Sequence, residues 1–238
     1  MIDDYWQSSP FGKDSIFNPS FDEKQKELKK QREEKQLFQA NNNSKPSWSK
    51  MLTNYPGKNI KTLDLYNEIG GQFPKFKNEQ ELNNSYLANS CSFRMSRGLN
   101  LSDIKLPGKS DKTQLVLIGA DKDKYWGRVK ELYPILKQKL GKPILEITLK
   151  KALLGEKKES MSTDQMKKLK ENKGIIMFEV SGWGDATGHF TLWDGNNLIY
   201  PGNPSHDDPN SELYYFNMKY EVNKKVIQTN KIILWDLK

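Results

Sequence analysis

Two residue types that are rare in this chain stand where they could act together in catalysis. The chain has 238 residues with a single cysteine, Cys91, and two histidines, one of which is His189. A thiol and an imidazole can form a nucleophile and its general base: the imidazole takes the thiol proton while the sulfur attacks a carbonyl carbon. We therefore ask whether the local sequence favours a reactive or a structural role for each residue.

The sequence around Cys91 predicts a helix that begins at the cysteine. Asn89 and Ser90 precede it, and both residue types favour the N-cap position. In the first turn of a helix, the free backbone N–H groups stabilise a thiolate and lower the thiol pKa. Arg94 and Arg97 follow and add positive potential. The alternative is a structural cysteine that packs as a small apolar side chain.

His189 opens a short apolar segment, 189–193, that has the composition of a strand. Gly188 comes directly before it, and a glycine there lets another part of the chain approach closely. Strand alternation places Thr191 and Trp193 on the same face as His189. A structural or exposed histidine remains the alternative interpretation of this position.

The order of the two residues favours joint chemistry. A helix-starting cysteine followed by a histidine on a strand is the order of papain-like enzymes. In such a site the first-turn amides also help to bind the tetrahedral oxyanion. A metal site is not supported, because one cysteine and two histidines offer too few ligands at zinc-like spacing. We find no cofactor motif.

The composition of the chain argues against several classes of protein. Hydrophobic residues make up 35%, charged residues 29%, and the net charge is +8. The basic residues are interspersed with acidic ones, which favours a solvated surface over a nucleic-acid-binding stripe. A single cysteine excludes an internal disulfide. The acidic start and the lack of a long apolar run predict a protein made in the cytoplasm without a signal peptide and without a membrane span.

The chain is expected to have two parts. Residues 1–47 read as an extension, with a charged helix over 22–38 and a polar linker over 39–47. Residues 48–238 read as one globular domain. Helical patterns come first and short strands after, so the predicted class is α+β. We expect helices over 62–69, 85–100 and 124–141, a lysine-rich loop over 150–173, and strands over 113–120, 174–180, 189–193, 197–200, 212–218 and 231–237.

Longer motifs around both candidate residues resemble a known family. The segment NSCSFRMSRGLN (89–100) resembles an N-x-C-x-x-R-x-S-x-x-L-N motif, and KGIIMFEVSGWGDATGHFTLWDG (173–195) resembles a glycine-isoleucine strand followed by D-A-T-G-H-x-x-L-W-D-G. Both belong to the fourth family of type VI secretion amidase effectors, and the closing KIILWDL (231–237) is similar too. The resemblance covers roughly residues 48–238.

The resemblance implies a papain-like, NlpC-type amidase. It implies that Cys91 is the nucleophile and His189 the general base, and that the substrate is a peptidoglycan stem peptide cut between D-glutamate and meso-diaminopimelate. It also implies delivery by the type VI apparatus into the periplasm of a rival cell, and a cognate immunity protein in the producer.

One departure from the family concerns the residue that orients the imidazole. The family places an acidic residue on the strand after the histidine. If Asp194-Gly195 forms a two-residue hairpin turn, Tyr200 lies opposite His189 instead. Within the segment 200–210 we select Asn203 as the third catalytic residue, because an amide suffices in papain-like enzymes. Other candidates are Tyr200, His206, Asp207 and Asp208, although His206 is more typical of a solvated loop. Trp183 either lines the substrate cleft or packs over the strand edge.

Two other classes of function stay open. A cysteine–histidine site on the same fold also serves proteases, isopeptidases, transglutaminase-type enzymes and acyltransferases. A basic binding module for nucleic acid or an acidic surface would explain the net charge of +8 without any chemistry.

Overall fold

The computed structural model describes residues 23–24, 26–30 and 45–238. The chain divides into two compact units, Met1–Ala40 and Asn41–Lys238. The described residues of the first unit are helical and exposed, as the charged sequence predicts. The rest of that predicted helix and residues 39–44 of the polar linker lie outside the described residues.

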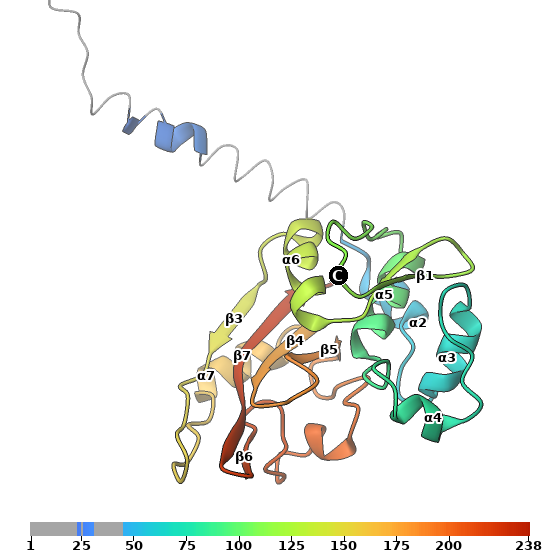
Figure 1. Ribbon diagram of the computed structural model, residues 1–238. Coiled ribbons are helices and arrows are strands. Elements are labelled where there is room, and N and C mark those ends of the chain that lie inside the picture. The colour runs from blue at the N-terminus through green and yellow to red at the C-terminus, as the bar shows by residue number, and fades with distance from the viewer. Residues whose placement is uncertain (1–22, 25, 31–44) are drawn as a thin grey trace, which may run out of the picture. The chain divides into compact units, whose positions relative to one another are not determined.

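A five-stranded antiparallel sheet organises the second unit (Figure 1). The strand order is β3, β7, β4, β5, and β6 also pairs with β7. β5 pairs with no other strand of this sheet than β4, so one of its edges faces away from the sheet. The strands are β3 (Leu145–Thr148), β4 (Gly174–Ser181), β5 (Gly188–Trp193), β6 (Lys219–Val222) and β7 (Lys225–Asp236). A separate two-stranded sheet joins β1 (Val116–Ile118) and β2 (Lys124–Trp126).

The helices precede or interrupt the strands. They are α2 (Trp48–Asn54), α3 (Thr62–Ile69), α4 (Glu79–Asn83), α5 (Cys91–Leu101), α6 (Val129–Leu140) and α7 (Thr163–Lys170), with a 3₁₀ turn η1 at Pro204–Asp207. Figure 1 shows α3 and α4 set apart from the sheet, and α5 between them and β5. Helices and an antiparallel sheet in one domain confirm the α+β prediction.

Strand alternation divides the core into two layers. In β4, Ile175 and Met177 belong to a cluster with α2, α5 and α6, whereas Ile176 and Phe178 belong to a cluster on the other side of the sheet. The second cluster includes Leu169 of α7. Both faces of the sheet are thus covered by apolar side chains, which explains why β4 reads as a continuous apolar run.

Several predicted elements are confirmed. α3 ends at Ile69 and is capped by Gly70, which has φ of 59°, a backbone conformation that glycine adopts readily. α5 begins at Cys91, the strands over 174–181 and 188–193 contain the two that were expected there, and β7 over 225–236 covers all but the last residue of the strand expected over 231–237.

Other predictions are wrong at particular segments. Trp126 lies in β2, so the helix predicted from residue 124 begins only at Val129. The lysine-rich loop contains α7, which starts with a capping box between Ser162 and Gln165. The segment 197–200 contributes only a single bridge, between Leu198 and Trp193.

The segment 212–218 is built of turns and not of a strand. Its apolar side chains Tyr215, Phe216 and Met218 are buried against the second core layer. The apolar residues that suggested a strand are therefore buried here by turns that cover one face of the sheet. No helix among the described residues is long and apolar enough to cross a bilayer.

Candidate active site

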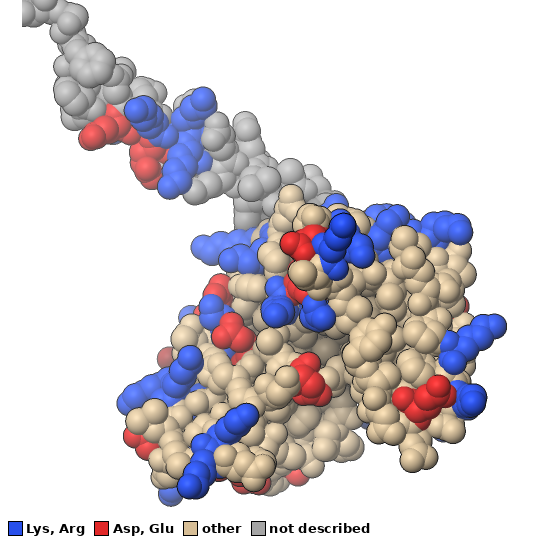
Figure 2. All heavy atoms as spheres, viewed as in Figure 1, with Lys and Arg blue, Asp and Glu red and all other residues tan. Residues whose placement is uncertain are grey.

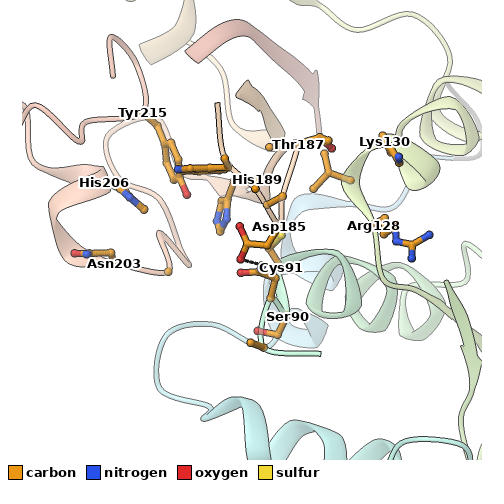
Figure 3. A pocket seen from close by; sticks show the side chains of 18 of the residues that line it. Ser90, Cys91, Arg128, Lys130, Asp185, Thr187, His189, Asn203, His206 and Tyr215 are labelled. Carbon is orange, nitrogen blue, oxygen red and sulfur yellow. Dashed lines mark hydrogen bonds between the residues drawn. The ribbon is translucent and has the colours of Figure 1, made fainter. Parts of the chain in front are cut away.

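A cavity of about 660 Å³ opens where the start of α5 meets β5. Cys91 and His189 both line it. Figure 3 shows these two side chains between the loop that carries Asn203 and His206 on one side and the start of α6, near Arg128, on the other. The structure thus brings together the two residues that the sequence singled out.

Cys91 is the first residue of α5 and is only 9% exposed. The backbone N–H of Phe190, the residue after His189, donates toward its sulfur. That amide is available because β5 is an edge strand; the Phe190 carbonyl at the same edge accepts from the Tyr55 hydroxyl at 3.5 Å. The nucleophile candidate is therefore positioned by a helix start and by the neighbouring strand edge.

Ser90 occupies the N-cap position of α5 but does not cap it. Its backbone is helical, at φ −93° and ψ −4°, and its side chain makes no capping hydrogen bond. The hydroxyl instead contacts Arg94 Nε at 3.0 Å and Thr62 Oγ1 at 3.0 Å. The N-cap function expected of this serine is thus absent, and no cap side chain occupies the amides of the first turn.

The thiol pKa moves in the direction opposite to the prediction. Burial raises the pKa of the Cys91 thiol, and the backbone amide of Phe190 and the side chain and amide of Ser92 lower it by less. The reason is that desolvation of a thiolate outweighs a few amide dipoles when the sulfur is almost fully covered. The resting thiol is therefore neutral at pH 7.

His189 is also buried, at 6% exposure. The preceding glycine permits this position, since a Cβ at Gly188 would lie 2.1 Å from the carbonyl oxygen of Phe178 on β4. The close approach expected of this glycine is confirmed. It lets β5 pair with β4 right up to the histidine, where Phe178 is the partner of His189.

The imidazole has a backbone acceptor. His189 Nε2 lies 2.7 Å from the carbonyl oxygen of Tyr200. A carbonyl only accepts, so Nε2 carries the hydrogen and Nδ1 of the neutral ring has the free lone pair. The observed acceptor of the imidazole is thus a backbone carbonyl, and not the side chain of Asn203 that was selected from the sequence.

The register explains this difference. Asp194-Gly195 is not a two-residue turn: Trp193 bridges Leu198, and Asp194 Oδ1 accepts from the amides of Asn196 and Asn197. The connection is two residues longer than predicted. Tyr200 consequently lies beside Thr191, whose Oγ1 accepts from the Tyr200 amide at 2.9 Å.

Burial lowers the pKa of the His189 imidazole, the hydrogen bond to the Tyr200 carbonyl raises it, and the nearby His206 and Arg94 lower it, which together bring it to about 4. No carboxylate among the described residues is hydrogen-bonded to this ring. The imidazole is therefore neutral at pH 7 and able to accept a proton through Nδ1.

The structure does not place Asn203 on the imidazole. Its side chain accepts from the Ser205 amide at 3.0 Å and caps the turn η1. Asp207 accepts from the Leu198 amide at 3.0 Å, and Asp208 from the Asn210 amide at 2.9 Å. Each of these predicted third residues is thus used locally, because short polar side chains in a turn-rich segment bond to nearby amides.

His206 is half-buried, which corrects the expectation of a solvated loop residue. Its Nδ1 lies 3.1 Å from the carbonyl oxygen of Pro201, and its ring packs on Tyr215 at 4.2 Å between centroids. Burial lowers its pKa. The Tyr215 ring stacks in turn on His189 at 5.0 Å. Tyr215 was assigned to a strand by the sequence, so nothing marked it as a neighbour of the site.

Trp183 lines the cavity, as one of its two interpretations predicted. Its indole N–H donates to the Tyr220 hydroxyl at 3.0 Å, and it also packs against the second core layer. Asp185, in the same glycine-rich loop, accepts from Asn89 Nδ2 at 2.8 Å. This bond joins the loops that lead to His189 and to Cys91.

Two of the arginines near the site are paired with carboxylates, so fewer unpaired positive side chains lie there than the sequence indicated. Arg97 is ion-paired with Glu68 and Asp121. Arg128 bonds to Glu131, whereas Lys130 is exposed at the cavity wall. Within the described residues, no group of three or more His, Cys, Asp or Glu side chains is arranged to hold a metal ion.

The fold and the cavity together define an α+β domain with a candidate cysteine–histidine active site. The family described as type VI secretion system (T6SS), amidase effector protein 4 (Tae4), matches residues 87–235, which is more than half of the chain and includes both residues. The chain belongs to this family.

Solved structures of the family have a similar fold. The Tae4–Tai4 effector–immunity complex from Enterobacter cloacae matches with a TM-score of 0.57 and 24% identity, over 82% of this chain and 99% of that one. The Tae4–Tai4 complex from Salmonella Typhimurium matches at 0.54 and 22%, with coverage of 82% and 99%. The effector Tae4 from Enterobacter cloacae matches at 0.56 and 25%, with coverage of 82% and 98%. The comparison with curated protein sequences gives no match.

Proposed function

We propose that this type VI amidase effector is a papain-like cysteine amidase that hydrolyses peptidoglycan stem peptides between D-glutamate and meso-diaminopimelate. The observation that carries the proposal is the placement of Cys91 and His189 at one cavity, within the part of the chain that matches the family. In this proposal Cys91 is the nucleophile and His189 the general base.

The catalytic cycle needs only groups that line the cavity. Nδ1 of His189 takes the thiol proton while the Cys91 sulfur attacks the amide carbon. The first-turn amides of α5, which Ser90 does not cap, donate to the developing oxyanion. The C–N bond then breaks, the imidazolium gives its proton to the leaving amine, and a thioester remains. A water molecule activated by His189 hydrolyses the thioester and restores the thiol.

The same proposal covers the division of the chain at residue 47 and the delivery of the protein to its substrate. We infer that 48–238 is the amidase domain and that the protein acts in the periplasm of a target cell after type VI delivery. The structures that match this chain include effectors bound to Tai4. We accordingly propose that an immunity protein binds this chain in the producing cell.

The test is digestion of purified muropeptides that contain D-glutamyl–diaminopimelate linkages. Wild-type protein should release new amine and carboxyl termini at that linkage, and Cys91→Ala should release none while melting at the wild-type temperature. Cleavage by Cys91→Ala at the wild-type rate would rule out the nucleophile. Cleavage of a different amide would point to the protease, isopeptidase or acyltransferase alternative.

The binding-module alternative has less support. Figure 2 shows the Lys and Arg side chains of the described residues in several separate groups, with acidic side chains among them. A continuous basic stripe is not seen on that face, and nucleic-acid binding by charge requires clustered cations.

A further inference from the structure

The hydrogen bond between His189 Nε2 and the Tyr200 carbonyl has the direction that a general base requires. It leaves Nδ1 unprotonated in the neutral ring. A side-chain carboxylate or amide usually provides this acceptor, and its own contacts hold it in place. A backbone carbonyl can provide the acceptor only if the peptide that carries it is itself held in place.

Tyr200 is held in place at several points. Its amide donates to Thr191 Oγ1 at 2.9 Å, and its hydroxyl lies 3.3 Å from Ser90 Oγ. The guanidinium carbon of Arg94 lies 4.0 Å from the centre of its ring, a close cation–π contact. Pro201 follows it, and this residue restricts the backbone. The peptide that presents the carbonyl is thus fixed from both sides.

Arg94 has an unusual environment. It is only 1% exposed, and no ion pair with a carboxylate is found for it among the described residues. Burial of an unpaired charge costs free energy unless other groups compensate. Here all of its hydrogen bonds go to neutral acceptors: Ser90 Oγ at 3.0 Å, the carbonyls of Pro56 at 3.0 Å, Gly57 at 3.0 Å and Ile60 at 2.7 Å, and Thr62 Oγ1 at 3.2 Å.

This arrangement joins the two halves of the site. Arg94 lies on α5, one turn after Cys91, and it contacts both the residue before the cysteine and the ring of Tyr200. The imidazole also stacks on two tyrosine rings, on Tyr215 at 5.0 Å and 23° and on Tyr200 at 5.7 Å and 23°. The His189 ring therefore packs against two tyrosines, one of which contacts Arg94.

We propose that the Tyr200 backbone carbonyl orients His189 in place of a side-chain acid or amide, and that Arg94 is the positioning residue that holds Tyr200 there. The catalytic part of this inference rests on the proposed function. The orientation of the imidazole does not, because it is a property of the protein without substrate.

Nitrogen NMR of the imidazole rings in the full chain tests the orientation directly. The chain has only two histidines, and His206→Asn assigns the remaining signals to His189. Wild-type His189 should be in the Nε2–H tautomer at pH 7. Tyr200→Leu removes the aromatic contact and should give a mixture of tautomers, whereas Tyr200→Phe keeps both ring and carbonyl and should keep the wild-type tautomer.

Kinetics on muropeptides test the catalytic consequence. Tyr200→Leu and Arg94→Lys should lower kcat by about 10- to 100-fold, with KM changed by less than about threefold. Tyr200→Phe should recover most of the loss. Arg97→Gln is the matched control: it removes an arginine of the same helix whose partners, Glu68 and Asp121, lie outside the cavity lining. It should leave kcat at the wild-type value.

The two readouts separate the two proposals. If wild-type protein cleaves no muropeptide, the proposed function fails and the tautomer series still decides the inference. An Nδ1–H tautomer in the wild type, or a folded Tyr200→Leu with wild-type tautomer and kcat, would overturn it. If Arg94→Lys does not fold, the comparison of Tyr200→Leu with Tyr200→Phe decides.

Discussion

The backbone N–H of Phe190 donates toward the sulfur of Cys91, so the strand that carries His189 also contacts the nucleophile candidate directly. This contact arises because β5 is an edge strand and α5 begins against its free edge. Edge amides need partners when they are covered. The start of the helix that carries the thiol and the strand that carries the imidazole therefore lie side by side, and both groups are neutral at rest.

A neutral pair predicts a particular pH dependence of thiol labelling. Burial raises the pKa of Cys91, so the thiolate should form only at or above about pH 8.5 unless a base assists. At pH 7 we expect His189→Ala to slow iodoacetamide labelling about tenfold or more, because the mutant lacks that base. At pH 10 the two proteins should react at equal rates.

The control for this experiment is the same series in denaturant, where both proteins expose the thiol and should react alike. A wild-type rate that is already maximal at pH 6 would instead indicate a thiolate–imidazolium pair at rest. Equal rates at pH 7 would mean that His189 does not assist the thiol.

Buried His189 should also make stability depend on pH. Burial lowers its pKa from 6.5 to about 4, so between these values the unfolded chain binds the proton and the folded chain does not. The free energy of unfolding should therefore be highest above pH 6.5 and should fall by about 3 kcal/mol as the pH drops toward 4.

Urea unfolding at pH 7, 5.5 and 4.5 measures this loss. His189→Gln cannot titrate, so its unfolding free energy should fall less steeply over the same range. Parallel curves for the two proteins would show that other groups cause the acid sensitivity.

Gly188→Ala should disrupt the pairing that positions His189. The added Cβ would lie 2.1 Å from the Phe178 carbonyl oxygen, so β4 and β5 must separate. We expect a loss of about 1–3 kcal/mol in the free energy of unfolding and a large loss of turnover. Gly108→Ala is the control, because no atom lies within 4 Å of its Cβ position. Wild-type stability of Gly188→Ala would contradict the close approach.

How far the sequence could predict the site depends on the range of the interactions. Cys91 and His189 could be predicted because each stands at the start of a helix or strand. The residues adjacent in the sequence determine where such an element starts. The acceptor of the imidazole was missed because it is a carbonyl, and every residue has one. Only the register of a longer connection selects the carbonyl of Tyr200.

The missed elements have similar causes. α7 was hidden by its lysines, although Ser162 and Gln165 at a spacing of three form a capping box that was readable in the sequence. The segment 212–218 has strand-like alternation, but its side chains are buried by the sheet face and its backbone forms turns. Tertiary packing decided that segment, and no local pattern predicts it.

Asn203→Ala separates the sequence prediction from the observed geometry. Because Asn203 caps η1 and does not bond to His189, we expect turnover on muropeptides to change by less than about threefold. A small drop in melting temperature should accompany the loss of the cap. A loss of about 100-fold in kcat at unchanged stability would restore Asn203 as the orienting residue and contradict the assignment to Tyr200.

A shortened chain should fold and catalyse, provided that it begins upstream of α2. Lys45 Nζ contacts Asp236 Oδ1 at 2.9 Å, and Ser47 caps α2 through the Lys50 amide at 3.2 Å. A chain that starts at Lys45 should therefore digest muropeptides at the wild-type rate with an unchanged melting temperature. A chain that starts at Trp48 loses the cap and the ion pair, and should lose about 1–2 kcal/mol in the free energy of unfolding. Reduced turnover by the chain that starts at Lys45 would show that the segment 1–44 contributes to the amidase domain.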